Sequence, residues 1–285
     1  MLSIGILINY NLFKNSKIKL KDKDVIDLII NNTYTYDNSN IVDKIIDKTL
    51  EISNPIKLLN KDYNKYLVRE EKVSNKAPPK DPIIYLYNTH QTEEYKTTEL
   101  VDYTVSPTVM INDYILQDLF DKSNYPTIVE EESISNILSQ NNWRYVNSYK
   151  ASRILLENSI IKYPSLKYFT DIHRDSLPRD KTTIEIDGKN YAKVIFIIGL
   201  ENNNYQENLS FTEKINNKMN EYYPGLSKGI YKKEGEGVNG VYNQDFSKYT
   251  ILIEIGGYEN TTLEVLNTTL AFSKCFLEVI NEDNV

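Results

Sequence analysis

Residues 83–94 read Ile-Ile-Tyr-Leu-Tyr-Asn-Thr-His-Gln-Thr-Glu-Glu. The first five are apolar or aromatic and have the length of a buried strand, and the run then breaks abruptly into polar residues. In an open α/β sheet, ligands bind just beyond the carboxyl ends of the strands. The sequence therefore predicts that His90 and Glu93 leave a strand at the place where a ligand binds.

Two further strand-like runs end in the same manner. Tyr168–Ile172 is followed by His173, and Tyr249–Ile253 is followed by Glu254. His173 and the earlier histidine are the only two in the chain. Two histidines and two carboxylates at three predicted strand ends indicate a metal hydrolase.

The order of predicted elements defines the fold class. Strands alternate with helices, which predicts an α/β fold with a mainly parallel or mixed sheet and helices on both faces. Helical periodicity marks residues 109–121, 148–162, 208–222 and 261–280, a short strand is expected at 127–129, and strands at 182–186 and 191–198 flank a hairpin turn. Residues 1–79 are predicted to be a helical extension and linker, and residues 80–285 the catalytic domain.

Composition excludes several classes of protein. A net charge of −7 provides no broad basic field for a general nucleic-acid binder. Cys275 is the only cysteine, so neither an intrachain disulfide nor a multi-thiolate zinc site can form. Residues 1–13 are too short to span a bilayer and lack the features of a signal peptide. Membrane association would therefore depend on an anchor that is missing from the sequence or that the sequence does not reveal.

The residue types at the three strand ends match zinc chemistry. Zinc accepts histidine nitrogen and carboxylate oxygen, and a catalytic site keeps one position for water. We expect His90, Glu93 and His173 to be the ligands, although Glu94 adjoins Glu93 and is an alternative. Asp171 shares a strand face with His173 and is expected to orient it. The competing interpretation is a pair of ordinary loop and surface histidines.

Glu254 is predicted to be the general base, because a carboxylate at the end of an apolar strand is costly to bury without a role. The alternative is a carboxylate that caps a nearby helix. Arg153 and Arg174 are candidates for binding a substrate carboxylate, and Asn243 and Gln244 for hydrogen bonding to an amide. The Gly-rich loop at residues 234–243 is expected to return to the site.

Six blocks of sequence carry a family resemblance, in this order: Tyr87–Glu93, Asp171–Asp175, Gly199–Asn202, Tyr223–Ile230, Asn239–Asp245 and Ile253–Gly257. Together they resemble the stage II sporulation protein P family, zinc-dependent peptidoglycan amidases of endospore-forming bacteria. The resemblance covers about residues 80–280. Lys228 departs from the pattern, which has arginine at that position.

The resemblance implies a fold similar to that of N-acetylmuramoyl-L-alanine amidases and cleavage of the bond between muramic acid and L-alanine. It also implies some cleavage of peptide cross-links, an extracytoplasmic septal or membrane-associated location, and action beside a lytic transglycosylase during engulfment. Two alternatives stay open. One is a metallo-carboxypeptidase or endopeptidase that acts on wall peptides, and the other is a non-catalytic module that binds the wall.

Overall fold

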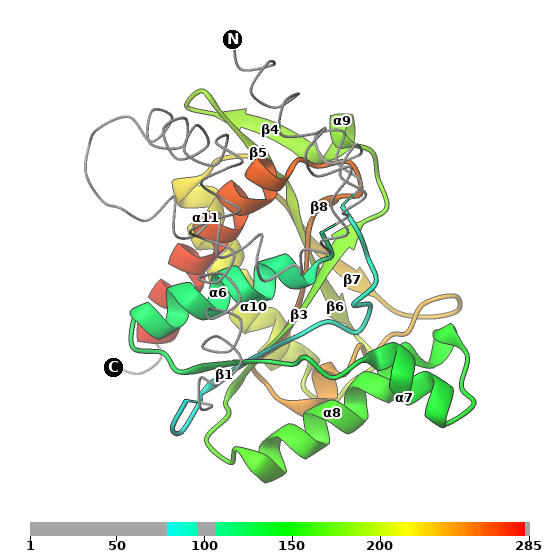
Figure 1. Cartoon of the computed structure of the whole chain (residues 1–285). Coiled ribbons are helices and arrows are strands. Elements are labelled where there is room, and N and C mark those ends of the chain that lie inside the picture. Colours follow the sequence, from blue (N-terminus) through cyan, green and yellow to red (C-terminus); the bar gives the residue numbers. More distant parts are fainter. Residues whose placement is uncertain (1–78, 96–106, 283–285) are drawn as a thin grey trace, which may run out of the picture. The chain divides into compact units, whose positions relative to one another are not determined.

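A six-stranded sheet runs through residues 79–95 and 107–282, the part of the chain that the computed structural model describes (Figure 1). Its strands lie in the order β2 (Thr127–Val129), β1 (Ile84–Tyr87), β3 (Tyr168–Asp175), β8 (Thr250–Gly257), β6 (Val194–Gly199) and β7 (Ser227–Lys233). Neighbouring strands are parallel except β6 and β8, which are antiparallel. The predicted α/β fold with a mostly parallel sheet is confirmed.

Helices cover both faces of this sheet. They are α6 (Met110–Lys122), α7 (Ile134–Gln140), α8 (Ser148–Lys162), the short α9 (Arg179–Thr182), α10 (Tyr205–Tyr222) and α11 (Thr262–Glu282), with single turns η3 (Tyr145–Asn147) and η4 (Gln244–Phe246). In Figure 1, α6, α10 and α11 gather on one side of the sheet and α7 and α8 on the other. The four predicted long helices correspond to α6, α8, α10 and α11.

Alternation along the strands decides which side chains meet which helices. On β1, Tyr85 and Tyr87 pack with Leu156 of α8 and with Phe169 of β3. On β3, Tyr168 points to the opposite face, where its ring packs on Phe211 of α10. Successive side chains of a strand point to opposite faces. Odd-numbered positions of β3 therefore face α8, and this places Asp171 and His173 on that face.

The predicted hairpin is present as a separate two-stranded sheet, β4 (Thr183–Ile186) and β5 (Lys189–Ala192). Asp187 and Gly188 form its turn with φ of 50° and 75°, as a two-residue hairpin turn of the primed type requires. The prediction of one strand over 191–198 is wrong. The chain divides at Lys193, whose N–H donates to Thr182 O and whose carbonyl accepts from the Gly256 N–H.

Besides α9 and the single turns η3 and η4, one helix and one strand were not predicted. Helix α7 follows the acidic residues 130–132 and is capped by Ser133, whose side chain accepts from the Asn136 N–H. Strand β7 lies at the edge of the sheet and its side chains are half-buried or exposed, so no apolar run marks it.

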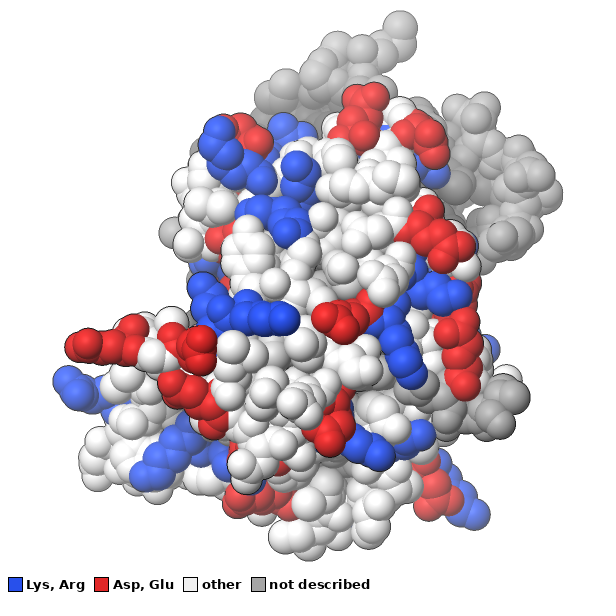
Figure 2. Space-filling model, turned by 180° about the vertical axis from the view of Figure 1, so that it is seen from behind, with Lys and Arg blue, Asp and Glu red and all other residues white. Residues whose placement is uncertain are grey.

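Several predictions fall outside the described residues. They are those for the helical extension and linker at residues 1–79, of which only residue 79 is described. Because residues 1–78 lie outside the described part, the predicted domain boundary near residue 80 stays a prediction. Among the described helices, none is long and apolar enough to cross a membrane. Figure 2 shows Lys and Arg interspersed with Asp and Glu on the face that it displays, without a continuous field of one sign.

Candidate metal centre at the strand ends

The carboxyl ends of β1, β3 and β8 bring the predicted site residues together. Strand register pairs Tyr87 with Asp171 and His173 with Glu254. His90 and Glu93 lie in the turn that follows β1, where the Glu93 N–H donates to the His90 carbonyl at 3.0 Å. Residues from three separated parts of the sequence thus converge on the sheet face that α8 covers.

His173 lies between two carboxylates. Its Nδ1 is 3.4 Å from Glu93 Oε2, and its Nε2 is 3.0 Å from Asp171 Oδ1. The second contact lacks the alignment of a hydrogen bond. Glu93 Oε2 also accepts the Arg174 N–H at 3.1 Å. Of the two adjacent carboxylates, Glu93 is therefore the one that reaches His173, whereas Glu94 contributes its backbone carbonyl to Arg174 Nε.

His90 is held by aromatic rings. Its imidazole stacks on Tyr145 with centroids 4.8 Å apart, and its edge contacts Tyr149 at 5.7 Å and His173 at 5.2 Å. The buried Nδ1 of His90 has no hydrogen-bond partner. An unpartnered buried nitrogen costs free energy unless a ligand satisfies it.

The charges around the two histidines shift their pKa values in opposite directions. Burial lowers the pKa of His173, but the charges of Asp171 and Glu93 and the contact with Glu93 outweigh it and raise that pKa to about 10. Burial and the neighbouring His173 lower the pKa of His90. Burial raises the pKa of Glu93, and the contact with His173 outweighs it, so the net shift is downward.

Glu254 differs from the other carboxylates of the site. It is half-buried, and burial together with the charge of Asp175 raises the pKa of its carboxyl from 4.5 to about 7. A carboxylate of this kind holds a proton near neutral pH more readily than an exposed glutamate does. Its position across from His173 fits the predicted role in moving a proton.

The fit of these residues to a metal ion can be tested on the geometry. Among the described residues, no group of three or more His, Cys, Asp or Glu side chains is closed around a common point. One pair is nevertheless spaced for it: two atoms bound to one tetrahedral zinc lie roughly 3.3 Å apart, and His173 Nδ1 and Glu93 Oε2 are 3.4 Å apart. The unpartnered His90 Nδ1 belongs to the adjacent ring. The donor set is suitable for zinc.

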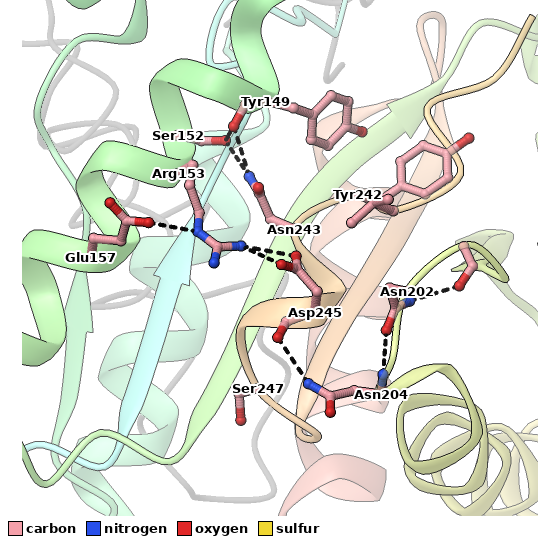
Figure 3. A network of polar contacts seen from close by, with 12 residues as sticks. Tyr149, Ser152, Arg153, Glu157, Asn202, Asn204, Tyr242, Asn243, Asp245 and Ser247 are labelled. Carbon is pink, nitrogen blue, oxygen red and sulfur yellow. Dashed lines mark hydrogen bonds and ion pairs between the residues drawn. The ribbon is translucent and has the colours of Figure 1, made fainter.

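Both arginines that were predicted to bind a substrate are occupied within the protein. Arg153 Nη1 donates to both carboxylate oxygens of Asp245 at 2.8 and 2.9 Å, and its Nε donates to Glu157 (Figure 3). Arg174 donates to the backbone carbonyls of Glu94 and Asp175. Lys228, in the position where the resemblance predicts arginine, pairs with Asp175 at 3.4 Å.

The predicted loop does return to the sheet, and its amides face inward. Gln244 is fully buried, accepts from the Gly199 N–H and donates to the Ile197 carbonyl. The Asn243 amide donates to the Tyr149 carbonyl and to Ser152 Oγ of α8 (Figure 3). A Cβ at Gly199 would collide with the Gly240 backbone, so glycine permits this close approach. Both amides hold the loop in place, and substrate binding by them stays a prediction.

Sequence reasoning missed the aromatic and hydroxyl side chains around the histidines. Tyr145, Tyr149 and Tyr242 line the site, with the Tyr149 and Tyr242 rings 5.4 Å apart. Thr89 and Ser152 hydrogen-bond to each other and Thr89 to Asp171. The chain contains 23 tyrosines, so no local enrichment distinguishes three of them. Only the spacing of Tyr145 and Tyr149 by one helical turn was visible in the sequence.

Fold and site together define an α/β protein with a histidine and carboxylate centre at its strand ends. The chain belongs to the stage II sporulation protein P (SpoIIP) family, whose sequence model matches residues 9–277. The match begins far before residue 80, where the resemblance of the sequence blocks began. Stage II sporulation protein P of Bacillus subtilis (strain 168) is 31% identical over 218 residues, which are 72% of this chain and 54% of that relative. The chain thus spans about half the length of the relative.

Solved structures with a similar arrangement include two from one organism. The CwlD amidase from Clostridioides difficile, solved in complex with the GerS lipoprotein, aligns with a TM-score of 0.48 at 12% identity and covers 70% of this chain and 98% of its own. Cwp6 from Clostridium difficile aligns with a TM-score of 0.44 at 10% identity and covers 70% of this chain and 29% of its own.

Proposed function

We propose that this chain is a zinc-dependent peptidoglycan hydrolase that cleaves the amide bond between the lactyl group of N-acetylmuramic acid and L-alanine. The observation that carries the proposal is the convergence of His90, Glu93 and His173 at one corner of the sheet, with a buried His90 nitrogen left unpartnered. Membership in the SpoIIP family supports the choice of peptidoglycan as substrate.

Three side chains would hold the metal: His173 through Nδ1, Glu93 through Oε2, and His90 through Nδ1. Zinc supplies a Lewis acid that polarises the scissile carbonyl and makes water a better nucleophile at neutral pH. Asp171 faces the other nitrogen of His173, as a carboxylate beside a metal-ligating histidine commonly does.

The proton transfers are assigned to Glu254. Its carboxylate takes a proton from the attacking water, whose oxygen forms a bond to the carbonyl carbon. The carbon–nitrogen bond then breaks, and the same proton passes to the departing amine of L-alanine. The position of Glu254 beside His173 in the strand register supports this role.

The setting of the reaction is inferred from the family. We place the protein in the extracytoplasmic wall space during sporulation, where septal peptidoglycan is remodelled in engulfment, beside a lytic transglycosylase. Cleavage of peptide cross-links is a secondary activity in this proposal, and an anchor outside the described residues would supply membrane association.

A metallo-carboxypeptidase is the nearest competing function. It needs a cation that is available to bind the free carboxylate of a peptide. The two arginines that could serve, Arg153 and Arg174, are occupied by Asp245 and Glu157 and by backbone carbonyls. These contacts favour the amidase over the carboxypeptidase.

Digestion of purified peptidoglycan by the full chain with added zinc tests the proposal, with the products separated and identified by mass spectrometry. We expect intact stem peptides with a free L-alanine amino group, together with denuded glycan. The His173→Ala variant is the matched control and should release nothing. Release of single amino acids would identify a carboxypeptidase instead, and wall binding without any product would identify a non-catalytic module.

A further inference from the structure

The carboxylate beside His173 is itself held by a neighbouring threonine. Asp171 is fully buried, and its Oδ1 accepts the Thr89 N–H at 2.9 Å while its Oδ2 accepts the Thr89 hydroxyl at 2.7 Å. Thr89 lies just beyond β1, and Asp171 lies within β3. Two bonds from one residue fix the plane of the carboxylate, and this carboxylate lies 3.0 Å from His173 Nε2.

The direction of the next hydrogen bond follows from the proton count. A threonine hydroxyl has a single proton, and Thr89 donates it to Asp171. Thr89 must therefore be the acceptor in its 2.9 Å contact with Ser152 Oγ of α8, and Ser152 the donor. The other acceptor within reach of the Ser152 hydroxyl is the Tyr149 carbonyl, which lies farther away at 3.2 Å.

The chain of bonds continues into the Gly-rich loop. Asn243 Nδ2 donates to Ser152 Oγ at 2.9 Å and to the Tyr149 carbonyl at 2.9 Å (Figure 3). Because a carbonyl can only accept, the nitrogen of the amide must face α8, which removes the usual ambiguity of an asparagine side chain. Hydrogen bonds thus run in one direction, from Asn243 through Ser152 and Thr89 to Asp171. Bonds aligned in this way polarise and strengthen one another.

The loop backbone adopts an unusual conformation at the residues that place the Asn243 amide. Tyr242 and Asn243 have φ of 54° and 55°, the left-handed region, which is unusual for a residue as large as tyrosine. Asn239 Oδ1 accepts the N–H groups of Val241 and Tyr242 at 3.2 and 2.6 Å and holds the turn. A left-handed conformation at such a residue costs free energy and persists only where surrounding contacts impose it.

We propose that Thr89, Ser152 and Asn243 are positioning residues that fix the orientation of His173 through Asp171. The inference rests on the proposed function, since the orientation matters because His173 Nδ1 is assigned to the metal. It gives Asn243 a different role from the substrate contact that its sequence position predicted. The Gly-rich loop then acts on the proposed metal centre indirectly, through Ser152 of α8.

Zinc affinity, measured by competition with a chromophoric chelator and without substrate, tests this chain of contacts. Thr89→Val keeps the shape and the backbone N–H but removes the hydroxyl, and we expect zinc affinity to fall about 10-fold or more. Thr89→Ser restores the hydroxyl and should return affinity to within about threefold of wild type. Ser152→Ala serves as a second break in the chain, should Thr89→Val fold poorly.

Asn243, at the loop end of this series of hydrogen bonds, is tested by a variant and a matched control. Asn243→Gly removes the amide while tolerating the positive φ, and it should weaken zinc by a smaller factor than Thr89→Val, on the order of threefold. Asn204→Ala is the control, since the Asn204 amide donates to the Asp245 carbonyl of η4, directly after the loop, and contacts none of the residues that link Asn243 to Asp171. Its zinc affinity should match wild type, and its melting temperature shows what a purely structural loss in this loop does.

Failure of the positioning role and failure of the proposed function would give different results. If the wild-type chain binds one zinc and Thr89→Val and Ser152→Ala bind it within twofold of wild type, the positioning role is wrong and the proposed function stands. If the wild-type chain binds no zinc, both are overturned. If Asn204→Ala weakens zinc as much as Asn243→Gly, the loop acts through general stability and the specific chain of bonds is wrong.

Discussion

Two buried carboxylate clusters in this molecule differ in how completely their polar atoms are satisfied. The capping cluster contains Glu264, Arg179, Asn260 and Thr261 at the start of α11. Glu264, which is 2% exposed, accepts from Arg179, from Asn260 Nδ2 at 2.8 Å and from the Thr261 N–H at 3.0 Å. Its own N–H donates to Thr261 Oγ1 at 3.2 Å, which completes a capping box.

The cluster around His173 is equally buried but incompletely bonded. His173 Nε2 and His90 Nδ1 are buried without a hydrogen-bond partner, whereas no polar atom of Glu264 or Asn260 is in that state among the described residues. Saturated groups such as the Glu264 carboxylate stabilise the fold, whereas an open nitrogen such as His90 Nδ1 costs stability until a ligand satisfies it. The comparison therefore separates the saturated cluster of Glu264 from the cluster that we propose to bind zinc.

The largest expected effect comes from a change in the proposed catalytic cluster that leaves the capping cluster intact. Glu254→Gln should lower turnover of peptidoglycan by a factor of about 10² to 10⁴, because it removes the group that transfers the proton. Zinc content, measured by mass spectrometry of the metal, should stay at the wild-type level. Loss of zinc in this variant, with Glu93→Gln still metallated, would exchange the roles of the two glutamates.

The opposite change breaks the capping cluster. Glu264→Ala should reduce the free energy of unfolding at pH 7 by about 2 kcal/mol, because the Thr261 N–H and one proton of the Asn260 amide lose their acceptor and half of the capping box is removed. Urea denaturation measures this difference. Zinc affinity of the folded variant should equal that of the wild type, and a weakened zinc site would show that the two clusters are not independent.

The same carboxylate predicts a dependence of stability on pH. Burial raises the pKa of Glu264, but the bonds from Arg179, Asn260 and Thr261 outweigh it, and the net pKa lies below the ordinary 4.5. A lowered pKa in the folded state means that the contribution is complete above the unfolded pKa and is lost as pH falls through the folded one. The difference in stability between wild type and Glu264→Gln should therefore shrink below about pH 4.3. A constant difference from pH 7 to pH 3 would contradict this.

The smallest effect concerns the aromatic wall. Tyr145 is 58% exposed and its ring stacks on His90 at 4.8 Å. Tyr145→Ala should raise KM by a few-fold with kcat little changed, because an exposed ring contributes contact area and not protons. Tyr145→Phe retains the ring and should behave as wild type. A large loss of kcat in the phenylalanine variant would assign the hydroxyl a role in the reaction.

The strands that carry the site could be predicted from the sequence, whereas contacts between distant elements could not. The runs before His90, His173 and Glu254 were recognisable as strands because they are short and rich in aromatic and β-branched residues, and β1, β3 and β8 lie there. Alternation of side chains along one strand also predicted that Asp171 and His173 share a face. Strand β7 escaped because an edge strand carries polar residues, and the break at Lys193 escaped because an apolar run does not reveal a change of direction.

Contacts made across α8 could not be predicted in this way. Ser152 reaches Thr89 and Asn243 only because the helix packs between the end of β1 and the Gly-rich loop. A single serine inside a helix has no pattern that marks it. Asn243 was noticed as a polar loop residue, but the direction of its amide depends on a left-handed backbone that the sequence does not specify.

Zinc binding by the full chain tests the central claim most directly. Metal-free protein would be titrated with zinc by calorimetry, in the wild type and in the His90→Ala, His173→Ala and Glu264→Gln variants. We predict one zinc per chain in the wild type and in Glu264→Gln, and loss of that site in both histidine variants. Equal zinc binding by the wild type and the doubly substituted His90→Ala, His173→Ala protein would contradict the assignment of the metal centre to the strand ends.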